Sequence, residues 1–187
     1  MTPTAVLPGS QSSLLDSRPP VSTRFETPVG EMIAVTDDRG LHLLEFVDRT
    51  ALPTEMKGIV RRFGPVESGA TAISAQVGHE LAEYFAGTRT RFTLPIIQRG
   101  TPFSELVWAA LAQIPCGEMR SYGQLAGSIG RASAVRALAR ANGANQVAIL
   151  VPCRRVIGAD GTLVGYGGKL WRKRWLLDHE RRVRTLF

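Results

Sequence analysis

A cysteine with two arginines directly after it stands at the centre of the stretch VPCRRVIG, residues 151–158. A cysteine that follows an apolar run, here 147–151, is most often an inert core side chain. Two features point instead to a nucleophile. Nearby cations such as Arg154 and Arg155 lower the pKa of a thiol and raise its thiolate fraction. Cys153 also stands between the apolar run and a glycine-rich loop, where side chains can face a cleft.

Two short helices are predicted upstream of this cysteine, one beginning at Tyr122 and one over about residues 133–141, joined by a tight turn containing Gly130. Most such pairs are simple packing units. Here the second helix combines alanines with Arg136 and Arg140, which suits close approach to a groove and its phosphates. The net charge of +7 also favours a polyanionic partner. We therefore expect a helix-turn-helix that contacts DNA.

The bulk composition fits one large domain or two small ones, with 187 residues, 44% hydrophobic and 21% charged. No apolar run is long enough to span a bilayer, so no membrane partner is expected. The first residues show no basic leader followed by an apolar core, which predicts a cytoplasmic protein with reduced thiols at Cys116 and Cys153. The cysteines and histidines have no metal-ligand spacing, so no metal site is expected.

Other elements follow from turn and periodicity signals. Turn residues at 28–30 and 37–40 predict a strand, a turn and two more strands over residues 24–46. Apolar spacing predicts helices over 74–86, ended by Gly87, and over 103–113, capped by Thr101 or Ser104, and favours a short strand at 92–96. A basic amphipathic helix should begin near Lys169, with its cations in solvent and these residues available for burial: Leu170, Trp171, Trp175, Leu176 and Leu177.

The segment PCRRVIGADGTLVGYGGKLWRKRWLLDHE resembles the active-site segment of the O6-alkylguanine-DNA alkyltransferase family, whose signature is Pro-Cys-His-Arg-Val. The stretches IPCGEMRSYGQLA, SAVRALARANGAN and VAILVPC match the family in order and spacing. The likeness is strong over residues 100–180 and fainter over 25–46. It implies an α/β, ribonuclease-H-like N-terminal domain over 23–98, after a loosely attached tail at 1–22. A mostly helical domain with the helix-turn-helix would cover 99–187.

The resemblance also implies a reaction and its residues. An alkyl group would pass irreversibly from O6 of a guanine flipped out of duplex DNA to Cys153, in a monomer without a cofactor. Tyr122 would help rotate the nucleotide and protonate the leaving base, and Asn145 would be the hinge after the recognition helix. Glu180 would end the proton relay, and Arg136 would fill the gap in the duplex. The recognition helix would enter the minor groove. DNA contacts would come from Ser121, Tyr122, Arg136, Ala137, Ala139 and Arg140, and the lesion pocket from Val151, Tyr166, Gly167 and Gly168.

The sequence departs from the family at Arg154, which stands where the relay histidine should be. Arginine cannot act as a general base, because its guanidinium stays protonated. In one interpretation, Arg154 lowers the pKa of Cys153 electrostatically and transfer survives. In the other, Arg154 pairs with Glu180 and the thiol stays protonated. Two milder departures are Gln146, in place of a proline, and Gly167, in place of a small polar residue.

Two other functions stay open. If transfer is absent, the protein would bind O6-alkylguanine and recruit downstream repair factors, as alkyltransferase-like proteins do. A transcriptional regulator that uses the helix-turn-helix is the third interpretation. Cys116 is expected to be a structural or incidental thiol. His179 is adjacent to Glu180 on one helix, and neighbouring helical positions diverge by about a hundred degrees, so it is a poor replacement base.

Overall fold

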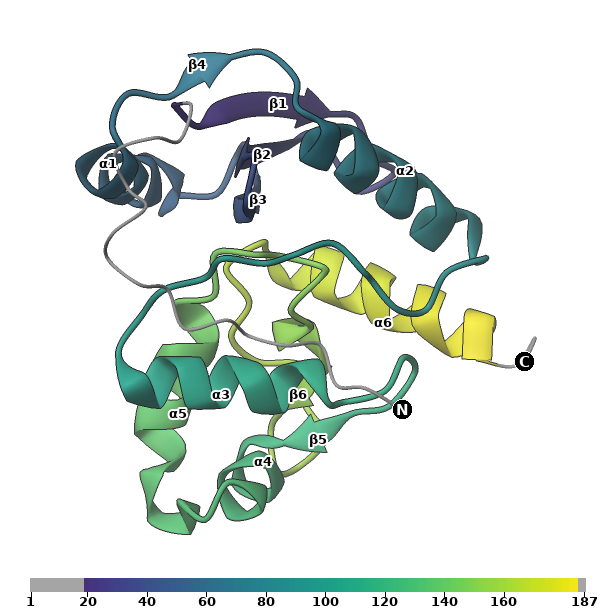
Figure 1. Cartoon of the computed structure of the whole chain (residues 1–187). Helices are drawn as coiled ribbons and strands as arrows, with labels where there is room; N and C mark the ends of the chain where they lie inside the picture. The colour runs from purple at the N-terminus through teal and green to yellow at the C-terminus, as the bar shows by residue number, and fades with distance from the viewer. Residues whose placement is uncertain (1–18, 185–187) are drawn as a thin grey trace.

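A four-stranded sheet forms the centre of the N-terminal half in the computed structural model, which describes residues 19–184 (Figure 1). The strand order is β3-β2-β1-β4. Strands β1 (Val21–Phe25), β2 (Met32–Asp37) and β3 (Gly40–Phe46) are antiparallel, and the short β4 (Glu67–Ser68) runs parallel to β1. The predicted meander is thus confirmed. Strand β1 begins inside the segment expected to be a tail, and residues 1–18 of that tail lie outside the described residues.

The two faces of the sheet have separate coverings, because side chains alternate along each strand. On one face, Ile33, Val35 and Leu43 pack with Ile59 of α1 (Leu52–Phe63). On the other face, Met32 and Ala34 join the main core with α2 (Ala72–Ala86) and the C-terminal half. The Thr71 side chain caps α2, and Gly87 ends it in the left-handed region at φ 78°. Helix α2 is confirmed, whereas α1 is absent from the sequence prediction.

The C-terminal half is mostly helical. It contains α3 (Pro102–Ala112), capped by the Thr101 side chain, then α4 (Tyr122–Ser128), the 3₁₀ turn η2 (Ala132–Ala134) and α5 (Val135–Gly143). A small parallel sheet joins β5 (Arg120–Ser121) to β6 (Val156–Ile157). The three predicted helices are confirmed. Residues 92–96 form no strand and contribute a single bridge between Ile96 and Leu41.

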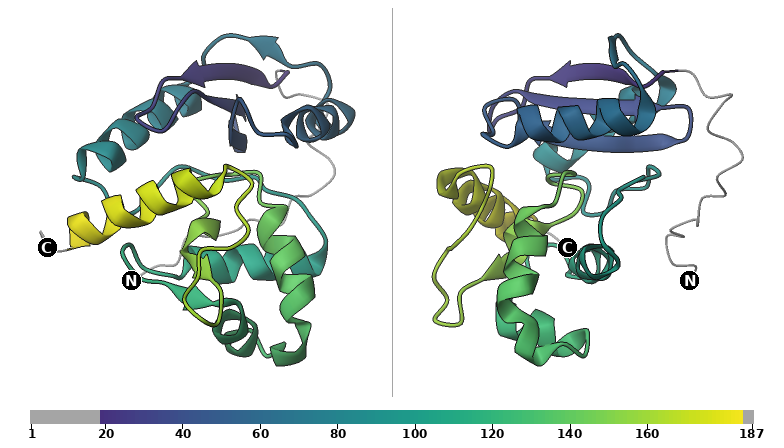
Figure 2. Two further views of the ribbon diagram at one scale, coloured as in Figure 1. Left: turned by 180° about the vertical axis from the view of Figure 1, so that it is seen from behind. Right: turned by 90° about the vertical axis from the view of Figure 1, so that its left-hand side faces the viewer.

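The two halves share one hydrophobic core and are joined by main-chain hydrogen bonds. The N–H of Leu44 donates to the carbonyl of Gln146 at 2.9 Å, and the N–H of Ala148 donates to the carbonyl of Leu44 at 2.7 Å. The segment immediately before the reactive-cysteine candidate is therefore tied to strand β3. Helix α6 (Leu170–Arg184) crosses between the N-terminal half, with its sheet and α2, and the C-terminal helices α3 to α5 (Figure 2).

The predicted faces of α6 are partly wrong. Leu170 and Trp171 are 48% and 51% exposed, while Arg172 and Lys173 are buried. The buried cations are tolerated because oxygens surround them: the amine of Lys173 donates to the carbonyls of Val156 and Val164 at 2.6 and 2.7 Å. The expectation that all cations of α6 lie in solvent is therefore wrong. The pattern of side chains along the sequence does not show where the main-chain carbonyls of Val156 and Val164 lie in the fold. None of the helices between residues 19 and 184 has the length and apolar character needed to cross a membrane.

Candidate active site

Cys153 opens a short 3₁₀ turn, η3 (Cys153–Arg155), and its side chain is nearly buried, with the residue 7% exposed. The apolar run before it turns tightly. Ile149 has φ 69°, a conformation that is costly for a β-branched residue. The N–H of Val151 donates to the carbonyl of Val147, and that of Cys153 to the carbonyl of Val151. The sulfur therefore lies at the end of a turn that contains a strained residue, Ile149, and that is held by main-chain hydrogen bonds.

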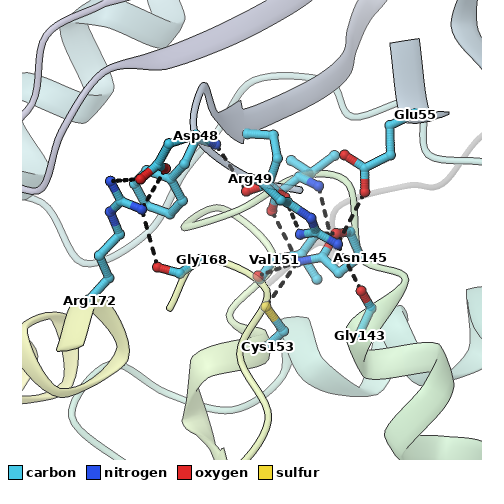
Figure 3. A network of polar contacts seen from close by, with 12 residues as sticks. Asp48, Arg49, Glu55, Gly143, Asn145, Val151, Cys153, Gly168 and Arg172 are labelled. Atoms are coloured by element: carbon cyan, nitrogen blue, oxygen red, sulfur yellow. Dashed lines mark hydrogen bonds and ion pairs between the residues drawn. The ribbon is translucent and has the colours of Figure 1, made fainter. Parts of the chain in front are cut away.

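Asn145 lies directly after α5 and connects this helix to the cysteine. Its amide nitrogen donates to the carbonyl of Val151 at 3.0 Å and to Sγ of Cys153 at 3.2 Å (Figure 3). Its amide oxygen accepts from the N–H of Val147 at 3.1 Å and from the Gln98 side chain at 2.9 Å. Every polar atom of this side chain is thus used to fix the cysteine-bearing turn relative to α5.

Arg154 forms an ion pair with Glu180, and both side chains are fully buried. Its Nε donates to Oε1 of Glu180 at 2.7 Å, and its Nη1 donates to the carbonyl of Ile149 at 2.7 Å. Arg155 donates to Oε2 of Glu180 at 2.7 Å, and the hydroxyl of Tyr84 donates to Oε1 at 2.9 Å. The carboxylate that would end a proton relay is therefore occupied by two guanidinium groups and a phenol.

The electrostatics of this cluster follow from its geometry. Burial alone would raise the pKa of Glu180, but the charges and hydrogen bonds of Arg154 and Arg155 outweigh it and lower that pKa to about 2. Burial raises the pKa of the Cys153 thiol, and the bond from Asn145 and the charge of Arg154 only partly oppose it. Of the two interpretations of Arg154, the structure contains the ion pair with Glu180, and the thiol is predominantly neutral.

The predicted lesion-pocket residues lie on what we call the lesion loop, residues 158–168, together with Val151. The hydroxyl of Tyr122 lies 3.3 Å from where a Cβ on Gly165 would be, so α4 contacts this loop. Burial and the neighbouring Cys153 raise the pKa of Tyr122, which keeps its hydroxyl protonated. The hydroxyl of Tyr166 is buried and has no hydrogen-bond partner among residues 19–184. Gly168 packs so closely against the Tyr166 ring that a Cβ there would lie 2.7 Å from it.

The predicted DNA contacts lie together on α4 and α5. Arg136, Ala139 and Arg140 are exposed and Ala137 is half-buried. Ser121 has a structural task as well, because its hydroxyl caps α4 by accepting from the N–H of Gln124 at 3.1 Å. The DNA-binding roles of these residues remain predictions.

His179 and Cys116, expected from the sequence to be a poor replacement base and an incidental thiol, make no hydrogen bond with the Cys153 sulfur within residues 19–184. His179 is buried, and its Nε2 contacts the carbonyl of Tyr84 at 2.7 Å. Cys116 is a half-buried free thiol, and burial raises its pKa. Sequence reasoning missed Arg49 and Tyr84, whose contacts with the site come from the other half of the chain and leave no local pattern.

Comparison with known proteins agrees with this geometry. Residues 102–182 match the family model described as 6-O-methylguanine DNA methyltransferase, DNA binding domain, and residues 21–97 match its ribonuclease-like domain. A relative from Salmonella typhimurium named methylated-DNA--protein-cysteine methyltransferase is 42% identical over 159 residues, which cover 84% of this chain and 93% of the relative. A Bacillus subtilis protein with the same name, termed constitutive, is 43% identical over 167 residues, covering 85% and 94%.

A solved structure gives the same result. The Mycobacterium tuberculosis protein described as OGT in complex with DNA is similar with a TM-score of 0.77 at 39% identity, covering 87% of this chain and 94% of that one. The similarity includes both halves of the chain and is not confined to the cysteine motif. The chain belongs to the 6-O-methylguanine DNA methyltransferase family.

Proposed function

We propose that this protein repairs DNA by transferring an alkyl group from O6 of guanine to Cys153, irreversibly and once per molecule. The observation that carries the proposal is the bond from the Asn145 amide to the Cys153 sulfur, directly after α5, in a chain that matches named methyltransferases over most of its length. The substrate is duplex DNA containing O6-alkylguanine, with the damaged base flipped out of the stack.

The reaction is a displacement at the alkyl carbon. A new bond forms between Sγ of Cys153 and that carbon, and the bond from the carbon to guanine O6 breaks. The thiol proton leaves to solvent, and the departing guanine gains a proton, for which the protonated hydroxyl of Tyr122 is the proposed donor. Solvent then returns a proton to the Tyr122 phenolate, so the protons balance. Because Arg154 replaces the relay histidine, thiolate forms only as the small fraction set by the raised pKa of Cys153.

A second candidate function is recognition of O6-alkylguanine without transfer, followed by recruitment of other repair factors. The observation that favours it is the buried cluster around Glu180. This carboxylate is fully engaged by Arg154 and Arg155, and no general base contacts the sulfur among the described residues. A flipped base could still be held by the lesion loop while the thiol stays protonated.

One experiment distinguishes these functions. The protein is incubated with a duplex containing a single O6-methylguanine, and the intact protein is weighed by mass spectrometry. A mass increase of one methyl group that is lost in Cys153→Ser supports repair by transfer. Tight, lesion-dependent binding with no mass change supports recognition alone. Binding to one promoter sequence without any lesion would instead revive the regulatory interpretation.

Several expectations remain part of this proposal. We place the boundary between the two domains near residue 98, the active protein as a monomer, and its action in the cytoplasm. We also propose that Arg136, Ala137, Ala139 and Arg140 contact DNA, with the recognition helix in the minor groove. A measured rise in DNA affinity as salt is lowered would support the phosphate contacts that these residues imply.

A further inference from the structure

Arg49 comes from the loop between β3 and α1, yet its guanidinium ends among the residues of the proposed acceptor site (Figure 3). Its Nη2 donates to the carbonyl of Gly143 at 2.8 Å, and its Nη1 donates to the carbonyl of Asn145 at 3.2 Å. These carbonyls belong to the end of α5 and to the hinge residue after it. A single side chain from the N-terminal half thus satisfies the Gly143 carbonyl that α5 leaves open at its C-terminus, and also the carbonyl of Asn145 beyond it.

The same guanidinium also forms a wall of the lesion loop. A Cβ on Gly167 would lie 2.8 Å from Cζ and 2.9 Å from Nη1 of Arg49. The guanidinium cannot easily move away, because it is paired with Glu45 and lies 3.1 Å from Oε1 of Glu55. Its side chain is 8% exposed. Arg49 is therefore fixed between two acidic side chains on one side and the hinge and lesion loop on the other.

The neighbouring residue, Asp48, connects the far end of the lesion loop to the same strand-to-helix segment. Its Oδ1 accepts from Nη1 of Arg172 at 2.7 Å, and the same Arg172 nitrogen donates to the carbonyl of Gly168 at 3.3 Å. Residues 48 and 49 thereby hold the loop at two consecutive glycines. The loop between β3 and α1 thus connects to the chain before Cys153 through Asn145, and to the chain after it through Gly167 and Gly168.

We propose that Arg49 is a positioning residue for alkyl transfer: it fixes the Asn145 hinge that bonds the Cys153 sulfur, and it sets the position of the lesion loop at Gly167. The inference rests on the proposed function. Arg49 acts through Asn145 and Gly167 and needs no contact with the alkyl group. Because displacement requires the sulfur to be aligned with the alkyl carbon, a shift of about 1 Å at the hinge is enough to slow transfer about 100-fold.

The removal of Arg49 would also change the electrostatics of the sulfur. The charge of Arg49 lowers the pKa of Cys153, whereas the charge of Glu45 raises it. Burial raises the pKa of Glu45 itself to about 7, so near neutrality this carboxylate is part ionised even with Arg49 beside it. Without Arg49, the pKa of Glu45 would rise further, so this carboxyl would be mostly neutral at neutral pH. In the alkaline range in which the thiol titrates, Glu45 would ionise beside the sulfur with no cation from Arg49 to oppose it. Misplacement and a higher thiol pKa act in the same direction on the transfer rate.

The test uses the full chain as Arg49→Met and Arg49→Lys, with Arg39→Met as a matched control. Arg39 makes an ion pair at 2.6 Å with the buried Asp37 in the same half of the molecule and contacts none of the site residues. Single-turnover transfer from an O6-methylguanine duplex gives two quantities, the rate constant of the active molecules and the active fraction. We expect the Arg49→Met rate constant to fall by about 10- to 100-fold, Arg49→Lys to fall less, and Arg39→Met to keep the wild-type constant.

A second measurement separates positioning from a stabilising role. Alkylation of Cys153 by iodoacetamide as a function of pH reports the thiol directly, with Cys116→Ser in all variants to leave one reactive group. The expected profile of Arg49→Met is displaced to higher pH. An Arg49→Met protein with a smaller active fraction but an unchanged rate constant and an unchanged alkylation profile would overturn the inference.

The wild-type protein distinguishes this inference from the proposed function. If the wild type takes no methyl group, the transfer proposal fails, and the alkylation profiles then decide the role of Arg49 alone. A double-mutant cycle with Gly167→Ala adds a further criterion. The new Cβ should slow transfer when Arg49 is present and have little effect in Arg49→Met, whereas additive effects would contradict contact between the two residues.

Discussion

Two groups of arginines, those on α5 and those around Glu180, carry the same charge and have opposite environments. Arg136 and Arg140 are exposed, and within residues 19–184 neither side chain has an assigned hydrogen bond or ion pair. Arg154 and Arg155 are buried, and they donate hydrogen bonds to one carboxylate, that of Glu180, and to main-chain carbonyls. The excess positive charge of the sequence is thus not one DNA-binding surface. Some of it is internal structure, and of these two groups only Arg136 and Arg140 are exposed to solvent.

The sharpest way to test the internal group is to remove its shared carboxylate. Glu180→Ala would leave two buried guanidinium groups without a counterion, and breaking a buried pair from one side costs about 3–5 kcal/mol of unfolding free energy. Urea unfolding followed by tryptophan fluorescence measures the loss. Glu31→Ala is the control, because its ion pair with Arg24 is exposed and should contribute less than about 1 kcal/mol. Equal losses in the two variants would contradict the internal role.

The substitution Arg154→His asks whether the buried cation limits chemistry. Histidine would return a general base beside Cys153, and general-base assistance contributes about 100-fold or more to a proton-transfer step. We expect the single-turnover methyl-transfer rate at neutral pH to rise by about that factor, accompanied by some loss of stability. Arg154→Met removes the charge without supplying a base, so its rate should not rise. A rate for Arg154→His no faster than wild type in folded protein would show that the missing base is not limiting.

The pH dependence of the wild-type rate gives a third test of the same cluster. Burial raises the pKa of Cys153 above its ordinary value, so most molecules hold a neutral thiol at neutral pH. Because only the thiolate attacks, the rate should rise about tenfold per pH unit up to that pKa, beyond the ordinary value of about 8.5. Single-turnover rates across this range measure the slope. A plateau beginning below about pH 7 would mean that another group ionises the sulfur.

The sequence predicts this site unevenly, and the reasons are physical. The motif locates Cys153 and Asn145 because their spacing is local to one turn and one helix end. It identifies Arg154 as the departure from the family, but not the direction of its side chain. That direction depends on Glu180, which lies on another helix. Arg49 has no motif at all, and its role exists only because strand β3 returns to the end of α5.

The same distinction applies to the fold. Turn residues and caps predict β2, β3, α2 and α3 because each has a local start or stop, such as Gly87 after α2 or Thr101 before α3. Helix α1 escapes prediction because Gly58, a poor helix former, lies inside it and its N-cap, Ala51, makes no side-chain hydrogen bond. The burial of Arg172 and Lys173 escapes as well, since their partners are carbonyls and a carboxylate from distant segments.

The exposed group is tested by Arg136→Ala, for which the smallest effect is expected. Each phosphate contact that is lost removes about one unit from the slope of log affinity against log salt concentration. The fold should be unchanged, because the Arg136 side chain is exposed. Fluorescence anisotropy with an undamaged duplex at several salt concentrations measures the slope. Arg61 is an exposed cation on α1, which packs on the face of the sheet opposite α2 (Figure 1). The substitution Arg61→Ala should leave the salt slope unchanged. If both substitutions lowered the slope equally, binding would depend on overall charge, and the two groups of arginines would differ in burial but not in their relation to DNA.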